Sequence, residues 1–173
     1  RRRRTAGLRT GGSVTARAAL FPFLNMIRLT RKLDDSAAHQ ATLTLPLEQR
    51  IRSRMRVELD DGSEAGLFLE RGSALRDGDL LADDDGFTVL IRAAAEPVST
   101  VDCSDPLMLA RVAYHLGNRH VPLQIEPGRV RYQHDHVFDD MVRGLGLPVR
   151  VEQAPFEPEA GAYGGHHHHA HDH

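Results

Sequence analysis

Apolar and polar residues alternate along the first half of the chain, with the two-residue period of half-buried β-strands. The segments MIRLTRKL (26–33) and ATLTLPL (41–47) show this alternation. Residues 54–69 and 79–93 are each typical of two strands joined by an Asp-Gly turn. No convincing helical pattern accompanies them, so the sequence predicts a small all-β unit over residues 26–97.

The second half of the chain mixes strand and helix patterns. Apolar residues recur at helical spacing over 109–116 and 138–145, and Asp105-Pro106 is typical of a helix start. Strand patterns occupy residues 98–103, 121–125, 129–133 and 149–153. The order β-α-β-β-α-β predicts a ferredoxin-like domain over residues 98–153, and hence an α+β protein.

Both ends of the chain are expected to lie outside these domains. Residues 1–25 contain six arginines and no acidic residue, and their apolar part is too short and too broken for a signal peptide. We expect residues 1–25 to be a disordered or mis-annotated extension, with initiation at Met26. Residues 154–173 are rich in Pro, Glu, Gly and His, which predicts a disordered His-rich tail without a core.

Charge and cysteine content exclude several classes of protein. Beyond residue 25 the chain has 16 basic and 24 acidic residues, which argues against a nucleic-acid-binding surface. Cys103 is the single cysteine, so an intramolecular disulfide and a thiolate-built zinc site are excluded. No apolar run approaches the roughly 20 residues of a membrane span. There is no Gly-rich phosphate loop and no evident nucleophile–base pair, so no enzyme activity is expected.

Histidine is the residue type that points to chemistry. Ten of the eleven histidines follow residue 114. Neutral imidazole suits Ni²⁺, Cu²⁺, Zn²⁺ and Co²⁺. The candidate ligands are His115, His120, His134, His136, His166, His167, His168, His169, His171 and His173. The tail cluster, HHHHAHDH, is interrupted by Ala and Asp, unlike a purification tag, and a flexible tail could collect ions for a fixed site.

Each internal histidine also has a simpler interpretation. His120 could be an ordinary loop histidine, and His115 a solvated residue on the flank of a helix. His134 and His136 would face one ion if both lay in a strand. Asp135 is also a good N-cap, however, and would then place His136 in a helix. The sequence pattern leaves these alternatives open.

Several longer motifs resemble one known family, the UreE urease accessory proteins, which are nickel metallochaperones. The resemblance extends from about Met26 to the end of the chain. It rests on DDGSEAGLFLERGSALRDGDLL (60–81), AYHLGNRHVPLQI (113–125), HDHVFDDMVRGLGL (134–147), APFEPEAGAYGG (154–165) and the His-rich ending. It implies a cytoplasmic homodimer with a β-rich, peptide-binding-like N-terminal domain and a ferredoxin-like metal domain.

The resemblance also implies roles for residues and partners. The histidine of the GNRH motif, His120, would bind nickel at the dimer interface, one from each subunit. His115, His134 and His136 would be further metal contacts, with additional coordination from the tail histidines. The implied partners are the urease apoprotein and its accessory GTPase complex. Two rival interpretations remain: a His-rich metal storage or detoxification protein, and a histidine metallohydrolase, for which no HExxH motif is present.

Overall fold

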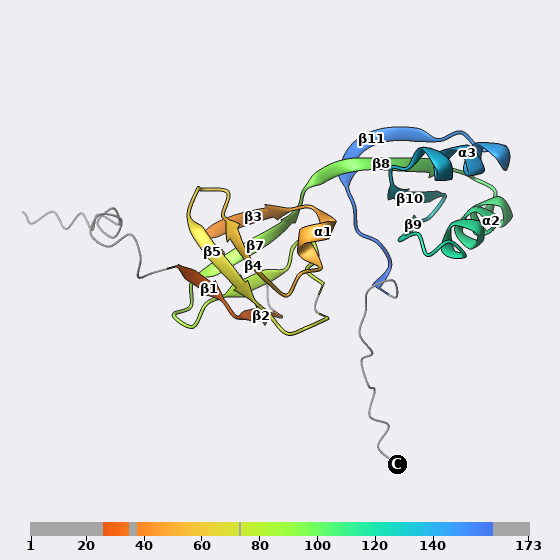
Figure 1. Ribbon diagram of the computed structural model, residues 1–173. Coiled ribbons are helices and arrows are strands. Elements are labelled where there is room, and N and C mark those ends of the chain that lie inside the picture. Colours follow the sequence, from red (N-terminus) through yellow and green to blue (C-terminus); the bar gives the residue numbers. More distant parts are fainter. Residues whose placement is uncertain (1–25, 35–37, 73, 161–173) are drawn as a thin grey trace, which may run out of the picture.

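The computed structural model describes residues 26–34, 38–72 and 74–160 and contains two sheet-based units (Figure 1). The chain passes from the first unit to the second at strand β8 (Ala95–Asp102). None of the helices in these ranges has the length and hydropathy that a bilayer crossing requires.

The N-terminal unit consists of a three-stranded sheet, β1-β5-β4, and a four-stranded sheet, β2-β6-β7-β3. Its elements are β1 (Ile27–Leu29), β2 (Arg31–Leu33), β3 (Ala41–Leu45), α1 (Leu47–Arg50), β4 (Arg54–Glu58), β5 (Glu64–Phe68), β6 (Leu80–Ala82) and β7 (Thr88–Ala93). Leu29, Leu67 and Ile91 are among the buried apolar residues that form its core. Both expected hairpins, β4–β5 and β6–β7, are confirmed.

Two details of this unit differ from the sequence prediction. The expected strand 26–33 is divided at Thr30, whose amide donates to the Ala82 carbonyl. On either side of this break, β1 pairs with β5 in one sheet and β2 pairs with β6 in the other. The short helix α1 follows Pro46, where no helix was expected. A helix of four residues is too short to show a 3.6-residue period in the sequence.

The C-terminal unit has the ferredoxin-like topology that the sequence predicts. Its sheet order is β11-β8-β10-β9, and every neighbouring pair is antiparallel. The remaining elements are α2 (Pro106–Gly117), β9 (Gln124–Glu126), β10 (Arg129–Gln133), α3 (His136–Gly144) and β11 (Arg150–Pro155). Val112 and Leu116 of α2 and Val142 of α3 share one apolar core with Val101 and Val130 of the sheet. The burial of these stripes holds both helices against the sheet.

The segment that follows β11 corrects one sequence expectation. Residues from 154 onward were expected to bury no core, but Phe156 is completely buried. It packs against Leu47 of the N-terminal unit and Val98 of β8. A single aromatic side chain among prolines and glutamates therefore anchors residues 154–160. The later part of the expected tail lies outside the described residues, as does the expected extension 1–25.

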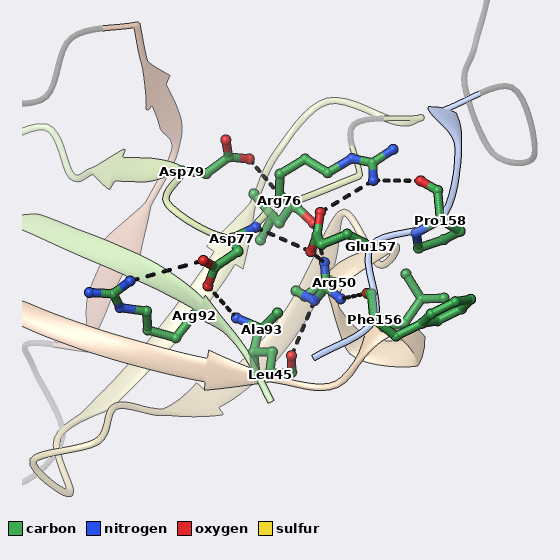
Figure 2. Close-up of polar contacts among 12 residues, drawn as sticks. Leu45, Arg50, Arg76, Asp77, Asp79, Arg92, Ala93, Phe156, Glu157 and Pro158 are labelled. Atoms are coloured by element: carbon green, nitrogen blue, oxygen red, sulfur yellow. Dashed lines mark hydrogen bonds and ion pairs between the residues drawn. The ribbon is translucent and has the colours of Figure 1, made fainter. Parts of the chain in front are cut away.

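Arg50 reinforces this junction from the N-terminal side (Figure 2). Its side chain is completely buried and donates to the carbonyl oxygens of Leu45, Leu75 and Phe156. It also forms an ion pair with the carboxylate of Glu157. A buried guanidinium is tolerated only when its donors are satisfied, so the position of segment 156–157 is set by the N-terminal unit.

Candidate metal centre

The internal histidines that the sequence singles out lie at one end of the C-terminal sheet. Gln133, the last residue of β10, pairs with Val98 near the start of β8. Strands β8 and β9 are both antiparallel to β10, so they run in the same direction. Helix α2 connects β8 to β9 and therefore returns the chain to the end of the sheet where β8 starts and β10 ends. His120 follows α2, and His134 follows β10. The topology therefore places both at the same end of the sheet.

His120 has an unusual backbone conformation. Its φ is 58°, in the left-handed region. Within the described ranges, every other residue with a positive φ is a glycine. The His120 amide donates to the Gly117 carbonyl, and the Val121 amide donates to the Leu116 carbonyl. Helix α2 ends at Gly117 with Asn118 as its right-handed C-cap, and His120 makes the left-handed turn that follows. This conformation costs an L-residue about 1 kcal/mol. The His120 side chain is exposed.

His115 lies in the last turn of α2 and is half-buried. Its ring forms a T-shaped pair with the Tyr114 ring, with centroids 5.3 Å apart and planes at 75°. Tyr114 itself is 63% exposed, and Leu107 on the same helix is 59% exposed. Helix α2 thus carries two large apolar side chains in solvent, and one of them, Tyr114, contacts His115.

The structure separates His134 from His136. Strand β10 ends at Gln133, and Asp135 caps α3 by accepting from the Val137 amide at 2.7 Å. His136 is therefore the first helical residue. The interpretation that places both histidines on one strand face is wrong, and the N-cap interpretation of Asp135 is confirmed.

His134 contacts a buried polar cluster that the sequence analysis did not identify. Asp139 is 1% exposed and accepts from the Ser99 hydroxyl at 2.6 Å and the Tyr132 hydroxyl at 2.9 Å. The Nδ1 atom of His134 lies 3.3 Å from the other oxygen of Asp139. Burial, and then the hydrogen bond to Asp139, raises the pKa of Tyr132 well above its ordinary value. The sequence feature that could have indicated this cluster is Ser99, a polar residue in the middle of strand β8, where residues 98–101 are all buried.

The described residues of one chain do not bring three potential ligands together. Among them, no group of three His, Cys, Asp or Glu side chains has the arrangement to hold a metal ion. The tail candidates His166, His167, His168, His169, His171 and His173 lie outside the described residues. A site at His120 would therefore draw its other donors from the tail, from a second copy of the chain or from solvent.

Comparison with known proteins identifies the family. Residues 24–94 match the sequence model described as the UreE urease accessory protein, N-terminal domain, and residues 96–173 match that of the C-terminal domain. The chain belongs to the UreE family of urease accessory proteins. The resemblance seen in the sequence is thereby confirmed, and the boundary between the two matched regions coincides with the start of β8.

Individual relatives are similar over most of their length. A protein named urease accessory protein UreE from Pseudomonas putida (strain W619) is 68% identical over 139 residues, covering 80% of this chain and 86% of the relative. The protein of the same name from Alcanivorax borkumensis is 60% identical over 156 residues, covering 82% of this chain and 89% of the relative. The protein of the same name from Enterobacter sp. (strain 638) is 58% identical over 139 residues, covering 80% of this chain and 91% of the relative. The folded part of this chain is therefore similar to nearly whole UreE proteins.

Proposed function

We propose that this chain is a cytoplasmic nickel metallochaperone that delivers Ni²⁺ for assembly of the urease metallocentre. The central site would be formed by His120 from each of two subunits, with the tail histidines loading it. His115, His134 and His136 would provide further contacts. Its partners would be the urease apoprotein and its accessory GTPase complex, and the chain itself would catalyse no reaction.

The conformation of His120 is the observation that carries this proposal. A non-glycine residue in the left-handed region is strained, and such strain is concentrated at functional sites. Glycine would adopt this left-handed conformation at lower cost, so the imidazole at this position needs another explanation. Its exposure leaves the ring accessible to an ion and to a second subunit.

The surface of α2 favours assembly with a second copy of the chain. Leu107 and Tyr114 are large, apolar and more than half exposed. Burial of such side chains is the main favourable contribution to association. A dimer that covers this helix would bring two copies of the adjacent His120 toward one another.

The proposed chemistry explains how the ion can be released. Two imidazoles leave coordination positions open to tail histidines, to water or to groups of a receiving protein. Cu²⁺ binds nitrogen ligands more tightly than Ni²⁺ does, and Zn²⁺ and Co²⁺ also bind them. Selection of nickel would therefore depend on the available metal and on the partners as well as on this site. Neutral imidazole is required, so loading should weaken as the pH falls through the histidine range.

The direct test is nickel titration by calorimetry, with the oligomeric mass measured in parallel. We expect one tightly bound ion per dimer in the wild type and its loss in His120→Ala. His39→Ala is the matched control, because His39 is also exposed but lies in the N-terminal unit. Tight binding that persists in His120→Ala would refute the proposal.

A storage protein is the alternative that the His-rich tail keeps open. Deletion of residues 166–173 separates the two functions. A store should lose most of its bound metal and have no effect on urease, whereas a chaperone should still activate urease through His120.

A further inference from the structure

The buried carboxylate of Asp139 contacts four side chains in the C-terminal unit. The hydroxyl groups of Ser99 and Tyr132 donate to its Oδ1 atom. Its Oδ2 atom lies 3.3 Å from His134 Nδ1 and 3.6 Å from Arg143 Nη2. Burying a carboxylate costs folding free energy unless its oxygens accept hydrogen bonds. Each neighbouring polar group should therefore direct a hydrogen toward Asp139.

The hydrogens of the cluster can be assigned by counting donors. A serine hydroxyl has one hydrogen, and Ser99 donates it to Asp139 at 2.6 Å. The Ser99 oxygen can therefore only accept from His134 Nδ1, which lies 3.1 Å away. Asp139 Oδ2, the other neighbour of this nitrogen, is also an acceptor. Nδ1 must carry a hydrogen, because an unprotonated Nδ1 would face two oxygen lone pairs.

We propose that Asp139 and Ser99 are positioning residues that fix His134 in its Nδ1–H tautomer and present the Nε2 lone pair to the metal ion. The part that concerns the metal rests on the proposed function, whereas the tautomer does not. Histidines that bind metals commonly donate their second ring nitrogen to a carboxylate, which orients the ring and increases its basicity. The His134 side chain is 38% exposed, so the ring is held at one nitrogen while part of it faces solvent.

His134 differs in this respect from the other internal candidates. No described side chain hydrogen-bonds to the rings of His115, His120 or His136. Among the described residues, no such hydrogen bond selects a tautomer for these three rings. Pre-orientation therefore distinguishes His134 as the candidate ligand whose donor atom is set before the metal arrives.

The tautomer can be measured in the metal-free wild type. Long-range ¹H–¹⁵N NMR spectra distinguish a protonated from an unprotonated ring nitrogen. We expect a protonated Nδ1 and an unprotonated Nε2 for His134, and mainly the Nε2–H form that free histidine favours for His136. A predominant Nε2–H form at His134 would overturn the assignment, and this measurement does not depend on any variant folding.

Asp139→Asn then tests the positioning role with little change in shape. The amide oxygen can keep the two hydroxyl donors, while the NH₂ group takes the place of Oδ2 and requires an acceptor. We expect the His134 tautomer to reverse and nickel affinity to fall about 10-fold, the lower end of the effect of second-sphere changes. Asp140→Asn is the matched control, because Asp140 is exposed on the same helix and its ion pair within the described residues is with Arg143. It should change neither quantity.

A double-mutant comparison separates positioning from a merely structural role. In a His134→Ala background, Asp139→Asn should cost no further nickel affinity. An equal loss with and without His134 would overturn the positioning role. Nickel binding that is unchanged in both His134→Ala and His120→Ala, with the Nδ1–H tautomer present, would instead refute the proposed function and leave the tautomer assignment standing.

Discussion

The guanidinium group of Arg50 is paired with the carboxylate of Glu157, which lies 107 residues later in the chain (Figure 2). Arg76 donates to the same carboxylate at 3.2 Å and to the carbonyl of Pro158 at 2.6 Å. Two arginines of the N-terminal unit thus hold the segment that leads into the His-rich tail. Residues 157 and 158 are therefore held against the N-terminal unit.

Glu157→Gln should destabilise the folded chain. Arg50 is completely buried, so the loss of its charged partner leaves an incompletely compensated guanidinium. We expect the free energy of unfolding to fall by about 2 kcal/mol, as for a hydrogen bond to a charged group. Urea denaturation measures this change. Glu48→Gln is the control, because its pair with Arg52 is exposed and should contribute less than about 0.5 kcal/mol. Equal effects of the two changes would contradict this account of the junction.

Phe156→Ala should destabilise the same junction through its apolar contacts. The ring is fully buried between Leu47 and Val98, and its removal would leave a cavity. We expect a loss of about 3 kcal/mol in the free energy of unfolding, measured by thermal or urea denaturation. Val151→Ala, at a side chain that is 48% exposed, should change stability by much less. A wild-type melting temperature for Phe156→Ala would show that segment 154–160 does not contribute to the fold.

The sequence predicted those parts of the fold whose signals are local. Alternation and Asp-Gly turns revealed the β4–β5 and β6–β7 hairpins, helical spacing revealed α2 and α3, and Asp105-Pro106 revealed the start of α2. The break at Thr30 and the anchoring of Phe156 depend on partners distant in the sequence. Neither periodicity nor composition reports such contacts, and a Pro- and Glu-rich segment has the composition of a disordered tail.

The candidate site was predictable to a similar extent. Histidine enrichment and the GNRH and HDH motifs indicated which side chains could bind a metal. The sequence did not show that Asp139 and Ser99 would contact His134, because Ser99 lies on β8, 35 residues before that histidine. It also did not show the left-handed conformation of His120, since residues other than glycine rarely adopt it.

Asp60 should make stability depend on acidic pH. This carboxylate accepts from the hydroxyls of Thr42 and Thr44 and from the Thr44 amide, and so joins the β4–β5 turn to β3. Burial raises the pKa of Asp60, but these hydrogen bonds outweigh it and hold the pKa below its ordinary value. A lowered folded-state pKa contributes stability above the unfolded-state value, and this contribution is lost as the pH falls.

Asp60→Asn tests this dependence. We expect a loss of about 1 kcal/mol in the free energy of unfolding at pH 7. The difference from wild type should shrink as the pH falls below about 4, where the wild-type carboxylate also becomes protonated. Urea denaturation over a series of pH values measures it, with the exposed Glu70→Gln as control. A difference that stays constant down to pH 2 would assign the effect to shape rather than charge.

Substitutions at His120 should separate stability from metal binding. With φ at 58°, His120→Gly relieves backbone strain, whereas His120→Ala retains it. In the metal-free state we expect His120→Gly to be about 0.5–1 kcal/mol more stable than His120→Ala, since glycine's larger unfolded-state entropy offsets part of the relief. Both variants should lose the tight nickel ion. Thermal denaturation and nickel calorimetry on the same samples give the two quantities. If the glycine variant is the less stable one, the imidazole or its backbone must make a stabilising contact within the fold, and the argument that this residue tolerates strain for the sake of a metal fails.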